Sequence, residues 1–199
     1  MDEIGLPECF NTDEVAKAMS MTFNNWDNDE YYRLLNKFDI PYNKEFKDLS
    51  RGNKMKLGIA IAMSHKAKLL ILDEATNGLD AVVRDEVVSM LNEFTRDEDH
   101  SILISSHIVS DLERLCDYIA FIHKGRLLLC EEKDKLLSSY GVINLSESEL
   151  ESINKDTILH ILKNEYGIKA VVKKESFSGH NVSPIGIEEL FVLMVKEDR

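Results

Sequence analysis

Two short apolar runs with a helical repeat between them set the central pattern of this chain. Leu69 to Leu72 is wholly apolar and too short for an amphipathic helix, so it predicts a strand buried on both faces. Ile102 to Ile104 predicts a second strand. The segment between the two runs is apolar at every third or fourth position: Val83, Val87, Met90, Leu91 and Phe94. Strand, helix and strand in this order predict an α/β fold.

The residues before Lys66 are patterned as helices. Asp27 with Glu30 three positions later has the form of a capping box, and Pro41 marks the end of that helix. Its apolar face is formed by Leu34, Leu35 and Phe38. Ser50 is a good N-cap for a second helix that runs through Lys54 to Met63. Residues 1–65 are therefore expected to form a helical subdomain.

Strands and helices continue to alternate after the second strand, as far as Tyr140. The predicted elements are a helix containing Val109, Leu112 and Leu115, a strand from Tyr118 to Ile122, a tight turn at Lys124-Gly125, a returning strand from Arg126 to Leu129, and a helix from Lys133 to Tyr140. Residues 66–140 form the second predicted domain. Because its strands would pair with strands that this sequence does not supply, we expect an exposed apolar sheet edge.

From Gly141 the pattern is that of a small α+β extension, residues 141–199. Ile158 to Lys163 and Ile168 to Lys173 flank a polar tetrapeptide and favour a hairpin, although a helix stays open for the first arm. Ser176 to Ser183 is predicted to be a polar loop. The last element is an amphipathic helix, residues 187–195, whose buried side is expected to be Leu190, Phe191, Met194 and Val195.

Two adjacent carboxylates, Asp73 and Glu74, follow the first strand directly. Ligands of open α/β sheets bind at the carboxyl ends of the strands, which is where these acids fall. An Asp at this point can hold Mg²⁺, usually through water, and a Glu beside it can polarise an attacking water. An acid pair after a strand is also a common entry to a surface loop. The neighbouring motifs favour the first interpretation.

Three motifs accompany the acid pair: Leu49-Ser50-Arg51-Gly52 upstream, Gly78-Leu79-Asp80 directly downstream, and Ser105-Ser106-His107 after the second strand. In this order and spacing the features resemble the second half of an ABC-type ATPase domain. The resemblance covers roughly residues 41–140 firmly and the flanks loosely. It implies a partial P-loop NTPase core with a helical signature subdomain, with ATP and Mg²⁺ as cofactors.

The resemblance implies three roles at the strand ends. Asp73 resembles the Walker B carboxylate, which orders Mg²⁺. Glu74 resembles the catalytic base that activates water. His107 resembles the switch histidine that senses the γ-phosphate, although a lone histidine in such a place is more often a partly buried structural residue.

The resemblance also implies contacts across a dimer. Ser50, Gly52 and Asn53 lie in the signature motif, which contacts ATP held by the opposite subunit, and Asp80 resembles the D-loop acid at that interface. As an N-cap, Ser50 can present its hydroxyl and the first free N–H groups to an anion. Gly52 is expected on the surface, so that Gly52→Asp blocks dimerisation at a folding cost of about 1 kcal/mol.

Other parts of the family pattern are missing. No G-x-x-x-x-G-K-[ST] occurs in the 199 residues, so no P-loop is present to cradle phosphates. The chain contains no glutamine, and Met1-Asp2-Glu3 falls where the Q-loop would come. The chain is either the carboxyl half of a longer ATPase or a short natural protein that does not bind nucleotide in a P-loop of its own. The sequence leaves both open.

The signature motif itself departs from the common LSGGQ. Arg51 and Asn53 replace Gly and Gln, and basic residues follow at Lys54 and Lys56. These cations would either add positive potential near a phosphate or form a solvated basic helix face. Ala75 stands where Pro is usual, which removes a fixed φ and should leave the carboxylates in place.

Composition narrows the class of protein further. A net charge of −12 argues against a nucleic-acid binder, which needs a surplus of Lys and Arg. Three scattered cysteines, Cys9, Cys116 and Cys130, have no metal-binding spacing and are expected to be reduced. No apolar run approaches the roughly 20 residues that cross a bilayer, and the acidic start is no signal peptide. A membrane role would therefore be indirect, with the chain at the inner face of the membrane through a partner.

The resemblance thus implies the carboxyl-terminal part of the ATP-binding subunit of a bacterial ABC exporter, with a transmembrane permease and a second ATPase subunit as partners. ATP-driven closure and opening of the dimer would drive the permease. Two alternatives stay open. One is a regulatory subunit that donates only its signature motif, and the other is a non-transport ABC ATPase.

Overall fold

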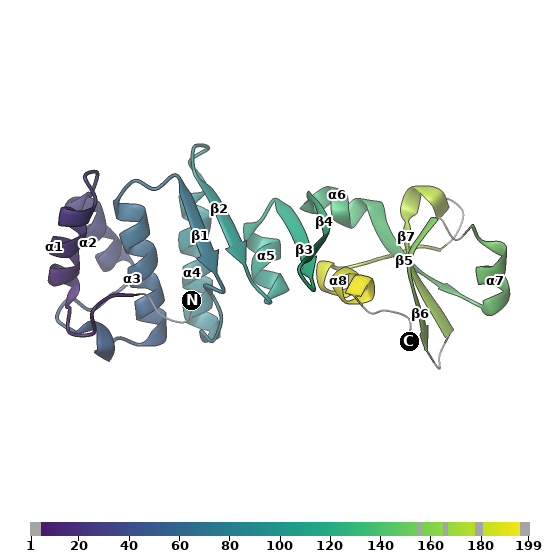
Figure 1. The fold of residues 1–199 in the computed structure, drawn as a ribbon, viewed down its shortest axis with the longest axis horizontal. Helices are drawn as coiled ribbons and strands as arrows, with labels where there is room; N and C mark the ends of the chain where they lie inside the picture. The colour runs from purple at the N-terminus through teal and green to yellow at the C-terminus, as the bar shows by residue number, and fades with distance from the viewer. Residues whose placement is uncertain (1–4, 155–156, 165–166, 178–180, 196–199) are drawn as a thin grey trace. The chain divides into compact units, whose positions relative to one another are not determined.

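The first helices pack together as a group in the computed structural model (Figure 1), which describes residues 5–154, 157–164, 167–177 and 181–195. They are α1 (Thr12–Thr22), α2 (Asn28–Lys37) and α3 (Arg51–Ser64), with a short 3₁₀ turn at Phe46–Asp48. Their shared hydrophobic core contains Val15, Tyr31, Leu34, Leu35, Leu57 and Ala60. The predicted helical character of this region is confirmed. Met1-Asp2-Glu3 lies outside the described residues.

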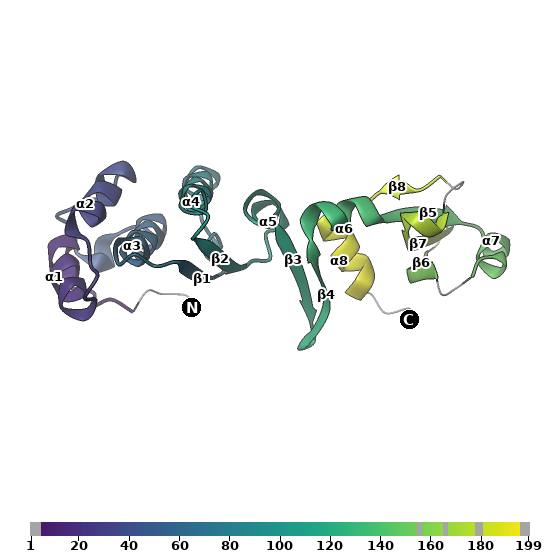
Figure 2. The same cartoon turned by 90° about the horizontal axis from the view of Figure 1, so that it is seen from above.

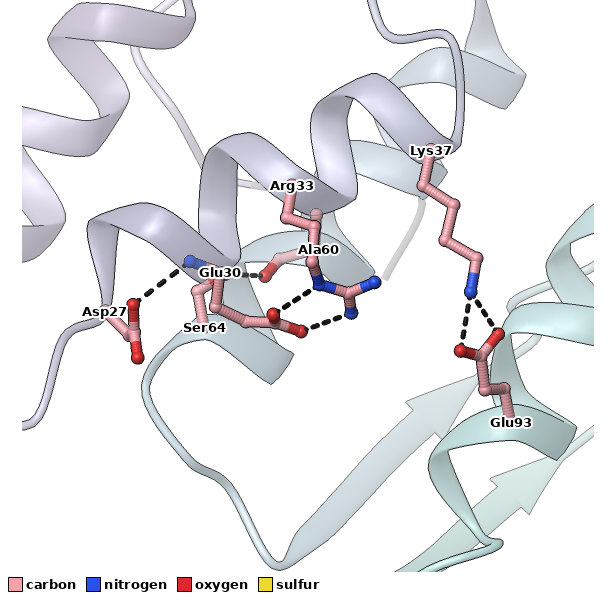
Figure 3. A network of polar contacts seen from close by, with 7 residues as sticks. All are labelled: Asp27, Glu30, Arg33, Lys37, Ala60, Ser64 and Glu93. Carbon is pink, nitrogen blue, oxygen red and sulfur yellow. Dashed lines mark hydrogen bonds and ion pairs between the residues drawn. The ribbon is translucent and has the colours of Figure 1, made fainter.

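Each of these helices begins at a side-chain cap. Asn11 and Glu14 form a complete capping box at α1, which the sequence analysis did not identify. Ser50 caps α3, as predicted. At α2 only half of the predicted box forms: Asp27 accepts a hydrogen bond from the Glu30 amide at 3.0 Å. The Glu30 carboxylate does not reach back, because it binds the guanidinium of Arg33, with Nε to Oε2 at 2.6 Å (Figure 3).

The strand–helix–strand unit follows, with β1 (Leu69–Asp73), α4 (Ala81–Phe94), β2 (Ser101–Ser105) and α5 (Val109–Leu115). The two strands are parallel, and their register pairs Asp73 with Ser105. Helix α4 covers one face of this sheet (Figure 2), packing Val87, Met90 and Leu91 against Leu70. The order, type and apolar helix face predicted for this region are confirmed.

The opposite face of the sheet corrects one expectation. A strand buried on both faces was predicted, yet Leu69 is 52% exposed, Ile71 72% and Leu103 62%. Side chains alternate between the two faces of a strand, and α4 covers only one of them. The chain therefore exposes an apolar sheet face, which is broader than the apolar edge expected.

Ion pairs join α4 to the preceding helices. Lys37 of α2 binds Glu93 of α4 (Figure 3). Lys56 of α3, with 8% of its side chain exposed, binds Glu86 of α4 and donates to the carbonyl of Phe38 at 3.2 Å. Helix α3, which begins at the Leu49-Ser50-Arg51-Gly52 motif, is thus fixed to α4 by a buried cation.

The remaining elements form a second compact unit. A hairpin of β3 (Tyr118–His123) and β4 (Arg126–Glu132) leads into α6 (Lys133–Ser139). Then come β5 (Tyr140–Leu145), α7 (Glu147–Ser152), β6 (Ile158–Asn164), β7 (Gly167–Lys173), a 3₁₀ turn at Lys174–Phe177, β8 (Ser183–Pro184) and α8 (Ile187–Val195). The antiparallel sheet has the order β6-β7-β5-β8.

Several predictions for this unit can be compared with the structure. The Lys124-Gly125 turn has positive φ at both residues, as a tight hairpin requires. The favoured β6–β7 hairpin is confirmed, and its first arm is a strand, not a helix; residues 165–166 of its turn lie outside the described residues. β5 and α7 were not predicted. Part of the predicted polar loop, residues 178–180, is also outside the description, and its ends are a 3₁₀ turn and β8.

Helix α8 has the predicted bounds but a different buried side. Ile187, Leu190 and Leu193 are buried, whereas Phe191, Met194 and Val195 are half-buried. The buried residues recur every third position, so the inward face is turned slightly from the one predicted. Phe191 packs edge-on against Phe121 of β3, with ring centroids 5.2 Å apart.

The boundary between the two compact units falls between Leu115 and Cys116 in the chain. This boundary differs from the predicted divisions after residues 65 and 140. Within the first unit α3 packs on α4, and within the second α6 packs on both β4 and β5. None of the helices in the described ranges has the length and hydrophobicity that crossing a bilayer requires.

Candidate functional site

The acid pair lies where β1 ends beside β2. Asp73 is the last residue of β1 and faces Ser105, the last residue of β2. The Ser105 hydroxyl donates a hydrogen bond to Asp73 Oδ1 at 2.5 Å. This bond lowers the pKa of the exposed Asp73 carboxyl below its usual value, so the group is a carboxylate at neutral pH.

Glu74 is turned out of the strand by an unusual backbone conformation. Its φ is +52°, in the left-handed region that few non-glycine residues occupy. Its amide N–H donates to the Ser105 carbonyl at 3.0 Å and lies 3.3 Å from the Ser105 hydroxyl. Its carbonyl accepts from the Asn77 amide at 3.0 Å, which starts the turn toward Asp80. Strained backbone of this kind concentrates at functional sites.

His107 is held at the Glu74 carboxylate. Nδ1 of His107 lies 2.6 Å from Oε2 of Glu74. The imidazole is 62% exposed and the carboxylate 37%, so both remain accessible from solvent. A carboxylate oriented by an imidazole can accept a proton from water, and the imidazole can carry positive charge toward an anion. His107 is therefore not a buried structural histidine.

The signature motif forms the start of α3. The Ser50 side chain accepts from the Asn53 amide at 3.2 Å and remains exposed. This confirms the predicted cap and places an exposed hydroxyl at a helix N-terminus, where anions are favoured. Asp80 plays the same part for α4: its carboxylate accepts from the amides of Val82 and Val83, both at 3.0 Å.

The surface position predicted for Gly52 is wrong. It is buried, and a Cβ at this residue would lie 2.6 Å from Cγ1 of Val83 in α4. Only a glycine allows α3 and α4 to approach this closely. Gly52→Asp would therefore damage the packing of the two helices and could not report on dimerisation alone.

The basic residues of the motif have intramolecular contacts. The Arg51 guanidinium lies against Gly78, whose φ of +68° marks the turn after the acid pair. Lys54 lies over the Phe46 ring, 4.9 Å from its centroid. Lys56 is buried in its ion pair with Glu86. These three basic residues therefore do not form a fully solvated basic face. They are also not simply free cations available to bind phosphate.

The acid pair fits one kind of metal site. Within the described residues no group of three or more His, Cys, Asp or Glu could hold a metal ion by itself. Mg²⁺ at nucleotide sites is typically held by one or two carboxylates together with phosphates and waters. A single ordered carboxylate, Asp73, beside the Ser105 hydroxyl at an exposed strand end suits that use.

The predicted site residues therefore fall into two groups. Asp73, Glu74 and His107 are brought together by β1 and β2. Ser50, Gly52 and Asn53 lie at the start of α3, where Gly52 packs against Val83 of α4, the helix that Asp80 caps. Ser105 was missed as a site residue, although its place in Ser-Ser-His after a predicted strand could have indicated it.

Parallel strands with an acid pair at their ends, and a capped glycine-containing helix beside them, are typical of an α/β nucleotide-binding domain. Residues 6–77 match the family model of the ABC transporter. The chain thus contains part of an ABC transporter ATP-binding domain.

Curated relatives agree with this assignment. The ABC transporter ATP-binding protein YtrB of Bacillus subtilis is 28% identical over 172 residues, covering 80% of this chain and 59% of that protein. The lantibiotic transport ATP-binding protein SrtF of Streptococcus pyogenes is 44% identical over 103 residues, covering 51% and 44%. The bacitracin transport ATP-binding protein BcrA of Enterococcus faecalis is 44% identical over 85 residues, covering 43% and 28%. The chain spans roughly half the length of the first two of these relatives.

Solved structures show the same fold. The ATP-binding subunit of an ABC transporter is 27% identical with a TM-score of 0.58, and the match covers 68% of this chain and 58% of that one. A putative metal-chelate type ABC transporter in an inward-facing conformation has a TM-score of 0.57 at 15% identity, covering 93% and 71%. The second likeness concerns the fold alone.

Proposed function

We propose that this chain is part of the ATP-binding subunit of an ABC exporter, in which ATP hydrolysis drives transport through a separate transmembrane permease. The observation that carries the proposal is the contact of His107 with Glu74 at 2.6 Å, next to Asp73 at the strand ends. SrtF and BcrA are named as transport proteins for a lantibiotic and for bacitracin, which favours export of a peptide-like compound.

The residues would divide the chemistry as follows. Glu74 would accept a proton from the attacking water, and His107, which contacts that carboxylate, would sense the γ-phosphate. Asp73 would hold Mg²⁺, which supplies charge neutralisation at the phosphates when bound. The cradle for those phosphates needs a P-loop, and no G-x-x-x-x-G-K-[ST] occurs in these 199 residues.

The signature motif would serve a second ATPase subunit. Ser50, Gly52 and Asn53 would contact ATP held by that subunit, and Asp80 would lie at the interface between the two. In this assembly the chain is cytoplasmic and peripheral to the inner face of the membrane, through the permease.

The test is Glu74→Gln in the transporter complex that contains this chain. The amide keeps the shape of the side chain and loses the proton acceptor, so hydrolysis should fall roughly a hundredfold or more while ATP still binds. Glu98→Gln, in an exposed loop, is the matched control. Near-normal turnover in Glu74→Gln would refute the assignment of the base.

A second function is favoured by one observation. The signature helix is fully formed in a chain whose sequence holds no P-loop motif. Such a subunit would donate Ser50 to a partner's ATP and hydrolyse none itself. Ser50→Asp tests this donation, because aspartate keeps the N-cap and adds an anion where phosphate would lie, while Ser50→Asn keeps the cap without charge. Donation predicts that only Ser50→Asp abolishes the partner's ATPase activity.

A further inference from the structure

The strongest unassigned feature near the acid pair is Ser105. Its side chain is exposed at the end of β2, directly opposite Asp73 in the parallel register. Its hydroxyl donates to Asp73 Oδ1 at 2.5 Å. A hydrogen bond to an ionised acceptor is short and strong, and it limits rotation of the carboxylate.

The same residue also holds the next one. The Glu74 amide donates to the Ser105 carbonyl at 3.0 Å and lies 3.3 Å from the Ser105 hydroxyl. These bonds support Glu74 at its φ of +52°. Because a residue in the left-handed region persists only when its surroundings fix it, the contact with Ser105 contributes to the direction in which the Glu74 side chain leaves the backbone.

Two residues further along the chain, His107 contacts the Glu74 carboxylate. One short segment, residues 105–107, therefore orients both acids: Ser105 at Asp73 and at the Glu74 backbone, and His107 at the Glu74 side chain. Ser106, between them, has a different use, since its hydroxyl accepts from the Ile108 amide at 3.0 Å.

We infer that Ser105 is a positioning residue that fixes the Asp73 carboxylate for Mg²⁺ and holds the Glu74 backbone in its strained turn. The inference rests on the proposed ATPase function, because it assigns Ser105 to the same site. Partners that orient metal-binding side chains matter: their loss typically lowers metal affinity or activity about 10- to 100-fold.

The test compares Ser105→Ala, Ser105→Thr and Ser106→Ala in the transporter complex that contains this chain. Threonine keeps the hydroxyl, and an exposed strand end tolerates the added methyl group. Ser106→Ala removes a neighbouring hydroxyl that does not touch the acids. The first readout is Mn²⁺ binding in the presence of a non-hydrolysable ATP analogue, followed through the electron paramagnetic resonance signal of free Mn²⁺. The second is the Mg²⁺ concentration that gives half-maximal ATPase activity.

We expect Ser105→Ala to weaken Mn²⁺ binding and to raise the half-saturating Mg²⁺ concentration, each about tenfold. Ser105→Thr and Ser106→Ala should resemble the wild type, and the thermal unfolding midpoints of all variants should agree. Unchanged Mn²⁺ affinity in Ser105→Ala would overturn the inference while leaving the proposed function intact. Equal losses in Ser105→Ala and Ser105→Thr would also overturn it. A wild-type complex that neither binds Mn²⁺ with the analogue nor hydrolyses ATP would overturn the proposed function, and the inference with it.

Discussion

Helices α3 and α4 approach each other closely at Gly52. We therefore predict that Gly52→Ala lowers the free energy of unfolding of the wild type but raises that of a Val83→Ala variant. A Cβ at Gly52 would lie 2.6 Å from Cγ1 of Val83, 3.4 Å from its Cγ2 and 3.5 Å from its Cβ. Only the contact with Cγ1 is too short, since the other two are ordinary van der Waals distances. Because a β-branched side chain is stiff at χ1, Val83 turns this methyl group away only at a cost in free energy. Gly52→Ala should therefore push the two helices apart.

Two opposing effects set the magnitude. Alanine in place of glycine favours a helix by up to about 1 kcal/mol, less in the first turn where Gly52 lies. Overpacking of a well-filled contact costs about 1–3 kcal/mol. Gly52→Ala should therefore destabilise the chain by about 1 kcal/mol. In a Val83→Ala background the clash disappears, so the same substitution should stabilise by a few tenths of a kcal/mol, which gives a coupling energy of about 1–2 kcal/mol.

Urea unfolding of the wild type, the two single variants and the double variant measures this coupling. The single tryptophan of the chain, Trp26, packs against the helical core of the first unit, so its fluorescence reports on that unit. The reasoning is wrong if Gly52→Ala raises the unfolding midpoint in the wild-type background, or if the effects of the two substitutions simply add.

Two further predictions follow from single contacts, and a third follows from the missing P-loop motif. Asp80→Ala removes both hydrogen bonds to the first amides of α4 and should lower the free energy of unfolding in urea by about 1 kcal/mol. Asp80→Asn keeps a capping side chain and should cost less. Equal losses in the two variants would contradict the capping role. Glu86→Ala leaves the buried Lys56 ammonium without its carboxylate, and it should lower the free energy of unfolding by about 1–2 kcal/mol after allowance for the exposure of Glu86. The double substitution Lys56→Met with Glu86→Ala should recover part of that loss. No recovery would contradict a stabilising role of the ion pair. Because no P-loop motif is present, the isolated chain should bind Mg-ATP with a Kd of roughly 1 mM or weaker in calorimetry, and a micromolar Kd would reveal an unrecognised site.

Local rules in the sequence were sufficient for much of the first unit. The caps at Asp27 and Ser50 and the apolar repeat of α4 act over a few residues, so spacing alone identifies the helices. The hairpin turn at Lys124-Gly125 is equally local, since its two positive φ values depend on the residue types in the turn. The acid pair could be placed at a strand end for the same reason.

Tertiary structure decided what depends on residues far apart in the chain. The exposure of Ile71 and Leu103 depends on which face of the sheet α4 covers. A run of apolar residues in the sequence does not predict that face. The burial of Gly52 depends on Val83, thirty-one positions later, and the bond from Ser105 to Asp73 depends on the register of two parallel strands. The sequence by itself indicated most of the elements, though not β5 or α7, and the chemistry that they carry. Only packing between elements determines which side chains meet, because contact requires both a register and a distance that no local pattern specifies.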